Sequence, residues 1–170
     1  MNKTITFEGG REVAFTSNAA TAIYYRRVFQ DDLITTLTGA ETSAMSVETI
    51  MRLAYIMALQ AAGDVRGASE DTALEWIASF ETNDFFDHAG EIVDIWFGNA
   101  KKTSQAKKKG KQTDRQMTTG LYMLRALQLG LTLSDLDRIE YGMVLDVITE
   151  AGNDNCEYND IADQADFDKF

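Results

Sequence analysis

Residues 99–115 contain six lysines and one arginine but no large apolar side chain. A segment of this composition cannot bury enough apolar surface to offset the entropy that it would lose on ordering. A hydrophobic core must therefore be built from the residues on either side of it. The sequence predicts a unit of one hairpin plus helices at 1–98, a flexible basic linker at 99–115, a small helical unit at 116–152 and an acidic tail at 153–170.

The distribution of charge follows a similar division. Residues 1–100 carry six basic and 15 acidic side chains, residues 101–130 carry eight and one, and residues 131–170 carry two and 11. The resulting net charges of −9, +7 and −9 give the chain its total of −11. An alternation of this kind is typical of linkers and interaction tails. The overall acidity makes nucleic acid an unlikely partner, because most of the surface would repel phosphates.

Alternation with a period of two is confined to the start of the chain. Residues 3–7 and 12–16 each alternate polar and apolar side chains, and Gly9-Gly10 between them suits a turn. This pattern predicts a β-hairpin. Later segments follow helical spacing, and the chain has no proline. The predicted fold class is therefore mainly α with a small N-terminal β-hairpin, an α+β arrangement.

The clearest predicted helix begins after Ser46, an N-cap residue, and ends at Gly63. Between them, apolar side chains recur at i, i+3, i+4 and i+7, as on one buried helix face. Two other helices are expected early in the chain, one from about Ala19 to Phe29 and a short turn that ends at Leu37. Further helices are expected to start at Ser69 and to run from Asn83 or Asp84 to Gly98, from Met117 to Gly130 and from Ser134 through Ile139. A last helix is expected to end at Gly152.

Sequence signatures of enzymes are missing. The chain has no Gly-rich phosphate loop, no Gly-x-Ser-x-Gly and no Cys-x-x-Cys. His88 is the only histidine, and Asp84, Asp87 and Glu91 surround it in sequence. A metal-dependent hydrolase at His88 is one alternative, but a solvated acidic helix face explains the same residues. We expect no catalytic residue, no cofactor and no metal.

A nucleic-acid-binding regulator acting through the basic segment 101–130 is the second alternative. The helices expected on either side of Gly130 resemble a helix-turn-helix, but the second carries Asp135 and Asp137, where phosphate contacts would be needed. The basic run also lacks the interleaved aromatic residues on which single-stranded nucleic acid stacks.

Localisation signals favour the cytoplasm. The N-terminus turns polar too soon for a signal peptide, and no apolar run approaches the roughly 18 residues of a membrane span. Cys156 is the only cysteine, so no disulfide can form within the chain, as expected in a reducing compartment.

Aromatic residues are concentrated between Trp76 and Phe97. Neighbouring residues on a helix lie about 100° apart, so the pairs Phe85-Phe86 and Trp96-Phe97 cannot both point inward. Part of this aromatic surface is therefore a candidate partner site. The candidate partner-binding residues are Phe85, Phe86, Trp96, Phe97, Leu121, Leu124, Leu136 and Ile139.

Several segments resemble tail assembly chaperones of long-tailed phages that infect Gram-positive hosts. They are residues 16–33 (TSNAATAIYYRRVFQDDL), 53–58 (LAYIMA), 75–81 (EWIASFE) and 91–96 (EIVDIW). The resemblance covers roughly residues 3–103. The chain departs from the family at Gln30, where Gly is usual.

The resemblance implies a function in tail assembly. Members of this family are commonly made in a short form and in a form extended by a programmed frameshift. The run at 101–111 lies where extensions join, and 116–152 resembles an extension. The implied partners are the tape measure protein, which the first unit keeps soluble, and the major tail tube protein, which the extension recruits. The chain is expected to act in the host cytoplasm during assembly and to be absent from the mature virion. Self-association is a further expectation.

Overall fold

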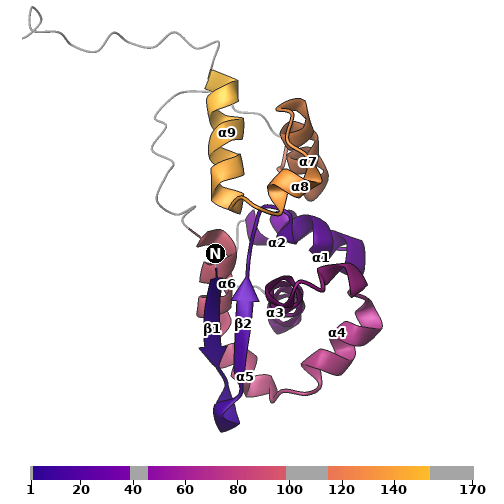
Figure 1. The fold of residues 1–170 in the computed structure, drawn as a ribbon, viewed down its shortest axis with the longest axis vertical. Coiled ribbons are helices and arrows are strands. Elements are labelled where there is room, and N and C mark those ends of the chain that lie inside the picture. The colour runs from indigo at the N-terminus through magenta and orange to yellow at the C-terminus, as the bar shows by residue number, and fades with distance from the viewer. Residues whose placement is uncertain (1, 39–45, 99–114, 154–170) are drawn as a thin grey trace, which may run out of the picture.

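The computed structural model describes residues 2–38, 46–98 and 115–153. Strand β1 (Asn2–Thr6) pairs antiparallel with β2 (Glu12–Thr16), with Ile5 opposite Val13. The turn between them, η1 (Glu8–Gly10), contains two glycines with positive φ. The predicted hairpin is confirmed, and so is the mainly helical fold class, because the other regular elements are helices (Figure 1).

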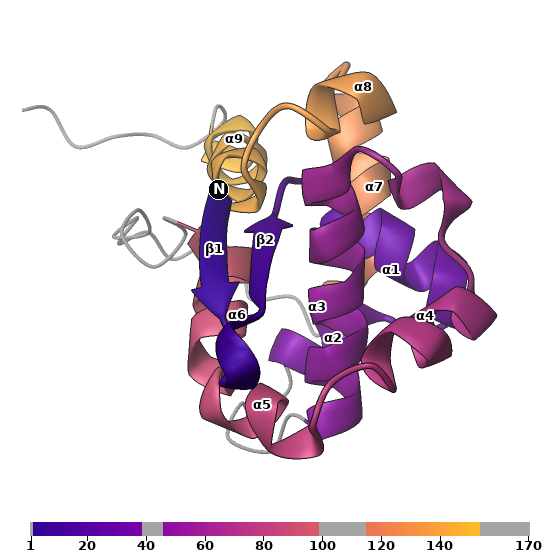
Figure 2. The same cartoon turned by 60° about the horizontal axis from the view of Figure 1, so that its bottom comes forward.

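The helices of the first unit surround α3. In chain order the helical elements are α1 (Thr21–Phe29), α2 (Leu33–Thr38), α3 (Val47–Ala62), η3 (Val65–Gly67), α4 (Glu70–Ile77), α5 (Thr82–Asp87), α6 (Ala89–Phe97), α7 (Thr119–Gln128), α8 (Leu133–Leu136) and α9 (Tyr141–Asn153). Helix α3 packs on β2, α1, α4 and α6, and Figure 2 shows it between the hairpin and α1. It is therefore the central element of the core.

Helix α3 begins and ends where its sequence predicts. The Ser46 side chain accepts a hydrogen bond from the Thr49 amide, and Gly63 ends the helix with φ 76°. The side chains of Leu53, Ile56 and Met57 are fully buried. Burial of side chains of this size contributes about 1.5–3 kcal/mol each, which makes this helix the main apolar contributor to the first unit.

The single helix expected from Asn83 or Asp84 to Gly98 is wrong. The backbone leaves helical geometry at His88, with φ −101° and ψ 7°, which separates α5 from α6. Helices α5 and α6 run in different directions (Figure 2), and Phe85 and Trp96 are both buried. In the unit at 116–152, Thr132 and not Ser134 caps the short helix α8, because the Thr132 side chain accepts from the Asp135 amide.

Helices α7 and α9 pack directly on the first unit, at the top of Figure 1. The Ala19 amide donates to the Ile139 carbonyl over 2.8 Å, and the Asn18 side chain donates to the Asp137 carbonyl over 2.9 Å. Tyr122, Leu136 and Tyr141 belong to the same apolar core as the residues of α3. The two units therefore share one core, while the predicted linker, apart from Arg115, and the predicted tail beyond Asn153 lie outside the described residues.

Candidate interaction surface

Large apolar side chains are exposed mainly on α7, α8 and α9. Within the described ranges, nine such side chains are exposed, and only Leu74 and Phe86 belong to the first unit. The other seven are Met123, Leu124, Leu127, Leu129, Leu133, Met143 and Val147. A concentration of exposed apolar side chains within so short a segment is typical of a surface that binds a partner.

Helix α7 carries one group of these side chains. The Thr118 side chain caps the helix by accepting from the Leu121 amide. Tyr122 and Ala126 are buried against the first unit. Met123, Leu124 and Leu127 are exposed, with spacings that place them on one side of the helix. We call these three residues the α7 face.

Helix α9 carries a second group. Met143, Val147 and Glu150 are exposed and follow one another at intervals of four and three residues, while Asp146 lies beside them and is half-buried. These four residues form the α9 face. Tyr141 and Val144 point the other way, into the core. The α9 face is therefore apolar and acidic, in contrast to the uncharged α7 face.

A cavity of about 420 Å³ lies between the two helices. It is lined by Arg125, Gln128, Leu129, Ile148, Ala151 and Gly152. The Arg125 guanidinium donates to the Gln128 side chain over 2.9 Å. Among the described residues that line the cavity, Arg125 is the only charged one, so the cavity can accept an apolar group that carries a hydrogen-bond acceptor.

The Asp32 carboxylate attaches α7 to the first unit. It accepts from the Thr119 amide at 3.0 Å and from the Thr119 hydroxyl at 2.9 Å, and it also accepts from the Thr35 amide in the first turn of α2. Burial raises the pKa of Asp32, but these hydrogen bonds and the charge of Arg26 outweigh burial, so the pKa is lowered overall. The carboxylate therefore stays ionised at neutral pH and binds both helix starts.

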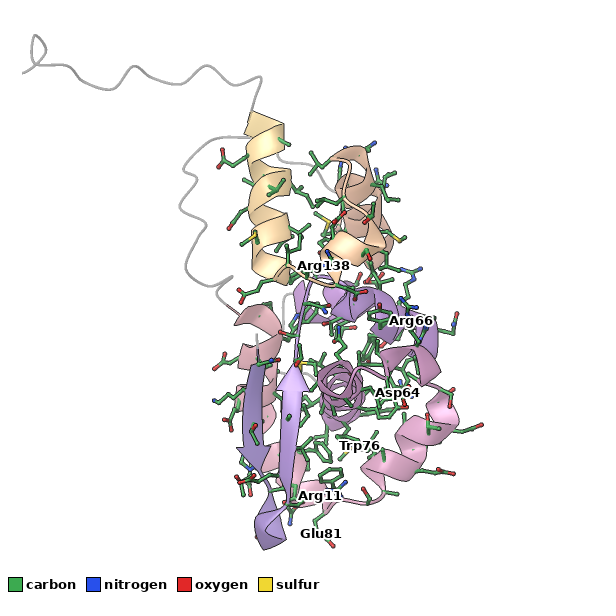
Figure 3. The ribbon with its side chains drawn as sticks, viewed as in Figure 1. Arg11, Asp64, Arg66, Trp76, Glu81 and Arg138 are labelled. Carbon is green, nitrogen blue, oxygen red and sulfur yellow. The ribbon has the colours of Figure 1, made fainter. Side chains whose placement is uncertain are left out.

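Tyrosines complete the contact between the units. Tyr141 stacks on Trp96 with ring centroids 4.7 Å apart, and burial raises its pKa to about 12. The Tyr122 hydroxyl donates to the Ala19 carbonyl over 3.1 Å. The Tyr24 hydroxyl donates to the Asp137 carboxylate over 2.9 Å. Burial raises the pKa of Tyr24, and the hydrogen bond to Asp137 raises it further. Figure 3 shows Arg138, which follows Asp137, at this junction.

The aromatic residues near the hairpin turn form a structural cluster. Phe80 packs edge-on against Phe7 and Phe85 and tilts against Trp76. The Arg11 guanidinium lies 3.7 Å from the Phe80 ring centroid and donates to the Ser79 carbonyl. Trp76 is half-buried, and Figure 3 shows Arg11 at the hairpin end. These contacts join the hairpin to α4 and α5.

His88 belongs to the same structural region. Its Nδ1 lies 3.1 Å from a Glu91 oxygen, and Lys3 pairs with Glu91 at 2.6 Å. The His88 ring packs edge-on against Phe7. Among the described residues, no group of three potential ligands gathers to hold a metal. The geometry accounts for His88 as a link between the hairpin and α6.

The predicted partner-binding residues are divided between core and surface. Phe85, Trp96, Leu121 and Leu136 are buried, so a partner cannot reach them in this conformation. Phe97 and Ile139 are half-buried. Only Phe86, 57% exposed, and Leu124, 44% exposed, lie open. The expectation that Phe85 and Phe86 cannot both point inward is confirmed, because Phe85 is in the core and Phe86 is exposed.

Sequence reasoning missed most of the two faces. Met123 and Leu127 are close to Leu124 in sequence, and Met143 and Val147 are separated by four residues. Such spacing places apolar side chains on one side of a helix and could have indicated both faces. Helical spacing alone does not say which apolar side of a helix meets the core. In α9 that choice depends on the contact between Tyr141 and Trp96.

No known family model matches the chain. No curated protein and no solved structure matches it either. Among the described residues, no helix is long and apolar enough to span a bilayer.

Proposed function

We propose that this chain is a non-enzymatic tail assembly chaperone of a long-tailed bacteriophage. It acts in the host cytoplasm, binds the tape measure protein and the major tail tube protein, and leaves before the virion is complete. The proposal starts from the resemblance of residues 16–33, 53–58, 75–81 and 91–96 to that family.

The observation that carries the proposal is the exposed apolar surface of α7–α9. Seven large apolar side chains there are not used in the core of the described chain. Binding a partner would remove them from water, at about 25 cal/mol for each Å² of apolar surface. A shallow helical surface suits a protein partner better than a small substrate, for which a deep pocket with convergent polar groups would be expected.

The proposal divides the two partners between the two units. The α7 face binds the tail tube protein, and the first unit binds the tape measure protein, with Leu74 and Phe86 as its exposed large apolar side chains among the described residues. The net charge of −11 keeps complexes with many bound copies soluble.

The test is a pull-down with separately expressed tape measure and tail tube proteins. The variant Leu124→Glu/Leu127→Glu places two charges on the α7 face, where both side chains are exposed and the fold should tolerate them. We expect this variant to lose most of its tube protein, because burying an unpaired charge at an interface is strongly unfavourable. Binding of the tape measure protein should be unchanged.

Ser134→Glu is the matched control, because Ser134 is an exposed polar residue of α8 in the same unit. It should leave both interactions intact. If the double variant retains tube protein at the level of the control, the α7 face is not the tube-binding surface. If the unaltered chain captures neither tail protein, the proposed function is wrong.

A further inference from the structure

The α9 face combines exposed apolar side chains with acidic ones. Met143 is 55% exposed and Val147 is 43% exposed. Asp146 and Glu150 lie on the same side of the helix, and within the described parts of the chain neither side chain makes an ion pair or a hydrogen bond. Between Ile139 and Asn153 the sequence has three acidic residues and no basic one.

The local electrostatics of this face are unfavourable without a partner. Asp146 and Glu150 are like charges at i and i+4, a pairing that destabilises a helix by a few tenths of a kcal/mol. Glu150 also lies near the C-terminus of α9, where the helix dipole favours a positive charge. A cation placed beside Asp146 and Glu150 would offset both effects.

We infer that the α9 face is a docking site for a basic amphipathic helix. The apolar side of the incoming helix covers Met143 and Val147, and its Lys or Arg side chains pair with Asp146 and Glu150. Helices that present apolar residues at i, i+3, i+4 and i+7 commonly bind to such surfaces. The inference rests on the proposed function only for the source of that helix, an assembly partner.

The experiment measures binding of three synthetic amphipathic helices to the full chain. The peptides share one leucine stripe and differ in their polar residues, which are Lys, Gln or Glu. We expect the Leu/Lys peptide to bind most tightly and to lose affinity as salt is raised, because exposed ion pairs are screened. Amide shifts in the NMR spectrum should concentrate at Met143, Asp146, Val147 and Glu150.

Two matched variants separate this site from the overall charge. Asp146→Asn/Glu150→Gln should weaken binding of the Leu/Lys peptide by about three- to tenfold, the effect of losing two ion pairs at the surface. The control Asp71→Asn/Glu75→Gln removes an exposed acidic pair with the same i, i+4 spacing on α4, beside the exposed Leu74. It should change the Kd by less than about twofold, because distant exposed charges are screened.

Several outcomes would overturn the inference. They are equal weakening by both double variants, equally tight binding of the Gln or Glu peptide, shifts that map elsewhere, and no binding of any peptide. None of these results bears on recruitment of tube protein by the α7 face. Conversely, peptide binding at α9 combined with a failed pull-down would remove the proposed function and leave the docking site standing.

Discussion

At the scale of single residues, the Asp32 carboxylate joins two segments that lie far apart in sequence. It accepts hydrogen bonds in the first turns of α2 and α7, from the Thr35 and Thr119 amides. Thr119 lies 87 residues away in sequence. One short side chain thus caps a local helix and also holds the α7–α9 unit in place.

We expect Asp32→Asn to lower the free energy of unfolding by about 1–2 kcal/mol at neutral pH, because hydrogen bonds to a charged group are lost. The folded-state pKa of Asp32 is lowered. Its contribution is therefore complete above the unfolded value of about 4 and is lost as the pH falls through the lower folded value. Denaturant titrations from pH 7 to pH 2 would measure both effects.

In those titrations the difference between the native chain and Asp32→Asn should shrink below about pH 4. Asp71→Asn, at an exposed position of α4, is the control and should follow the native curve. A difference that stays constant down to pH 2 would mean that ionisation of Asp32 is not the cause.

At the scale of elements, the contact between α6 and α9 depends on aromatic stacking. Trp96 is 2% exposed and Tyr141 is 5% exposed, and their rings lie nearly parallel at 28°. The Tyr122 ring also packs against Tyr141, with ring centroids 5.3 Å apart. The start of α9 therefore contacts both α6 and α7.

We expect Tyr141→Ala to lower the free energy of unfolding by about 3–5 kcal/mol, the usual range for removing a buried aromatic ring. Tyr141→Phe keeps the ring and should cost far less. Phe86→Ala removes a ring that is 57% exposed and should cost less than about 0.5 kcal/mol. Thermal and urea unfolding of the three variants would test this, and a small effect of Tyr141→Ala would contradict the role of the stack.

At the scale of the whole molecule, the two units predicted from the sequence are joined by shared packing. If they unfolded separately, Trp96 would report the loss of α9 before the far-UV signal of the other helices changed. We expect one transition instead, with Trp96 fluorescence in a Trp76→Phe background coinciding with circular dichroism. Two separated midpoints would show independent domains.

The sequence predicts those parts of the fold that local signals determine. The hairpin and α3 were predicted because alternation, a capping Ser46 and a terminal Gly63 all lie within a few residues. The break at His88 was missed, because the apolar spacing continues from Phe85 through Ile92 to Trp96.

The candidate surface was less accessible to sequence reasoning. Leu121 and Leu136 were expected to bind a partner but are buried, since α7 docks on the first unit and Leu136 joins the same core through contacts distant in sequence. Leu124 was predicted and is exposed, but Met143 and Val147 were not predicted. Which side of a helix faces solvent depends on what covers its other side. For α7 the covering residues are distant in sequence, as in the contact between Thr119 and Asp32, which are 87 residues apart.

Because these contacts join residues far apart in sequence, the first unit is synthesised well before the helices that cover it. Asn18 and Asp137, which share a hydrogen bond, are 119 residues apart. At about 5–20 residues per second, a ribosome needs roughly 2–9 s to proceed from the end of α6 to the start of α9. During that interval Trp96 lacks its stacking partner, so the nascent first unit presents an aromatic surface that the finished protein covers.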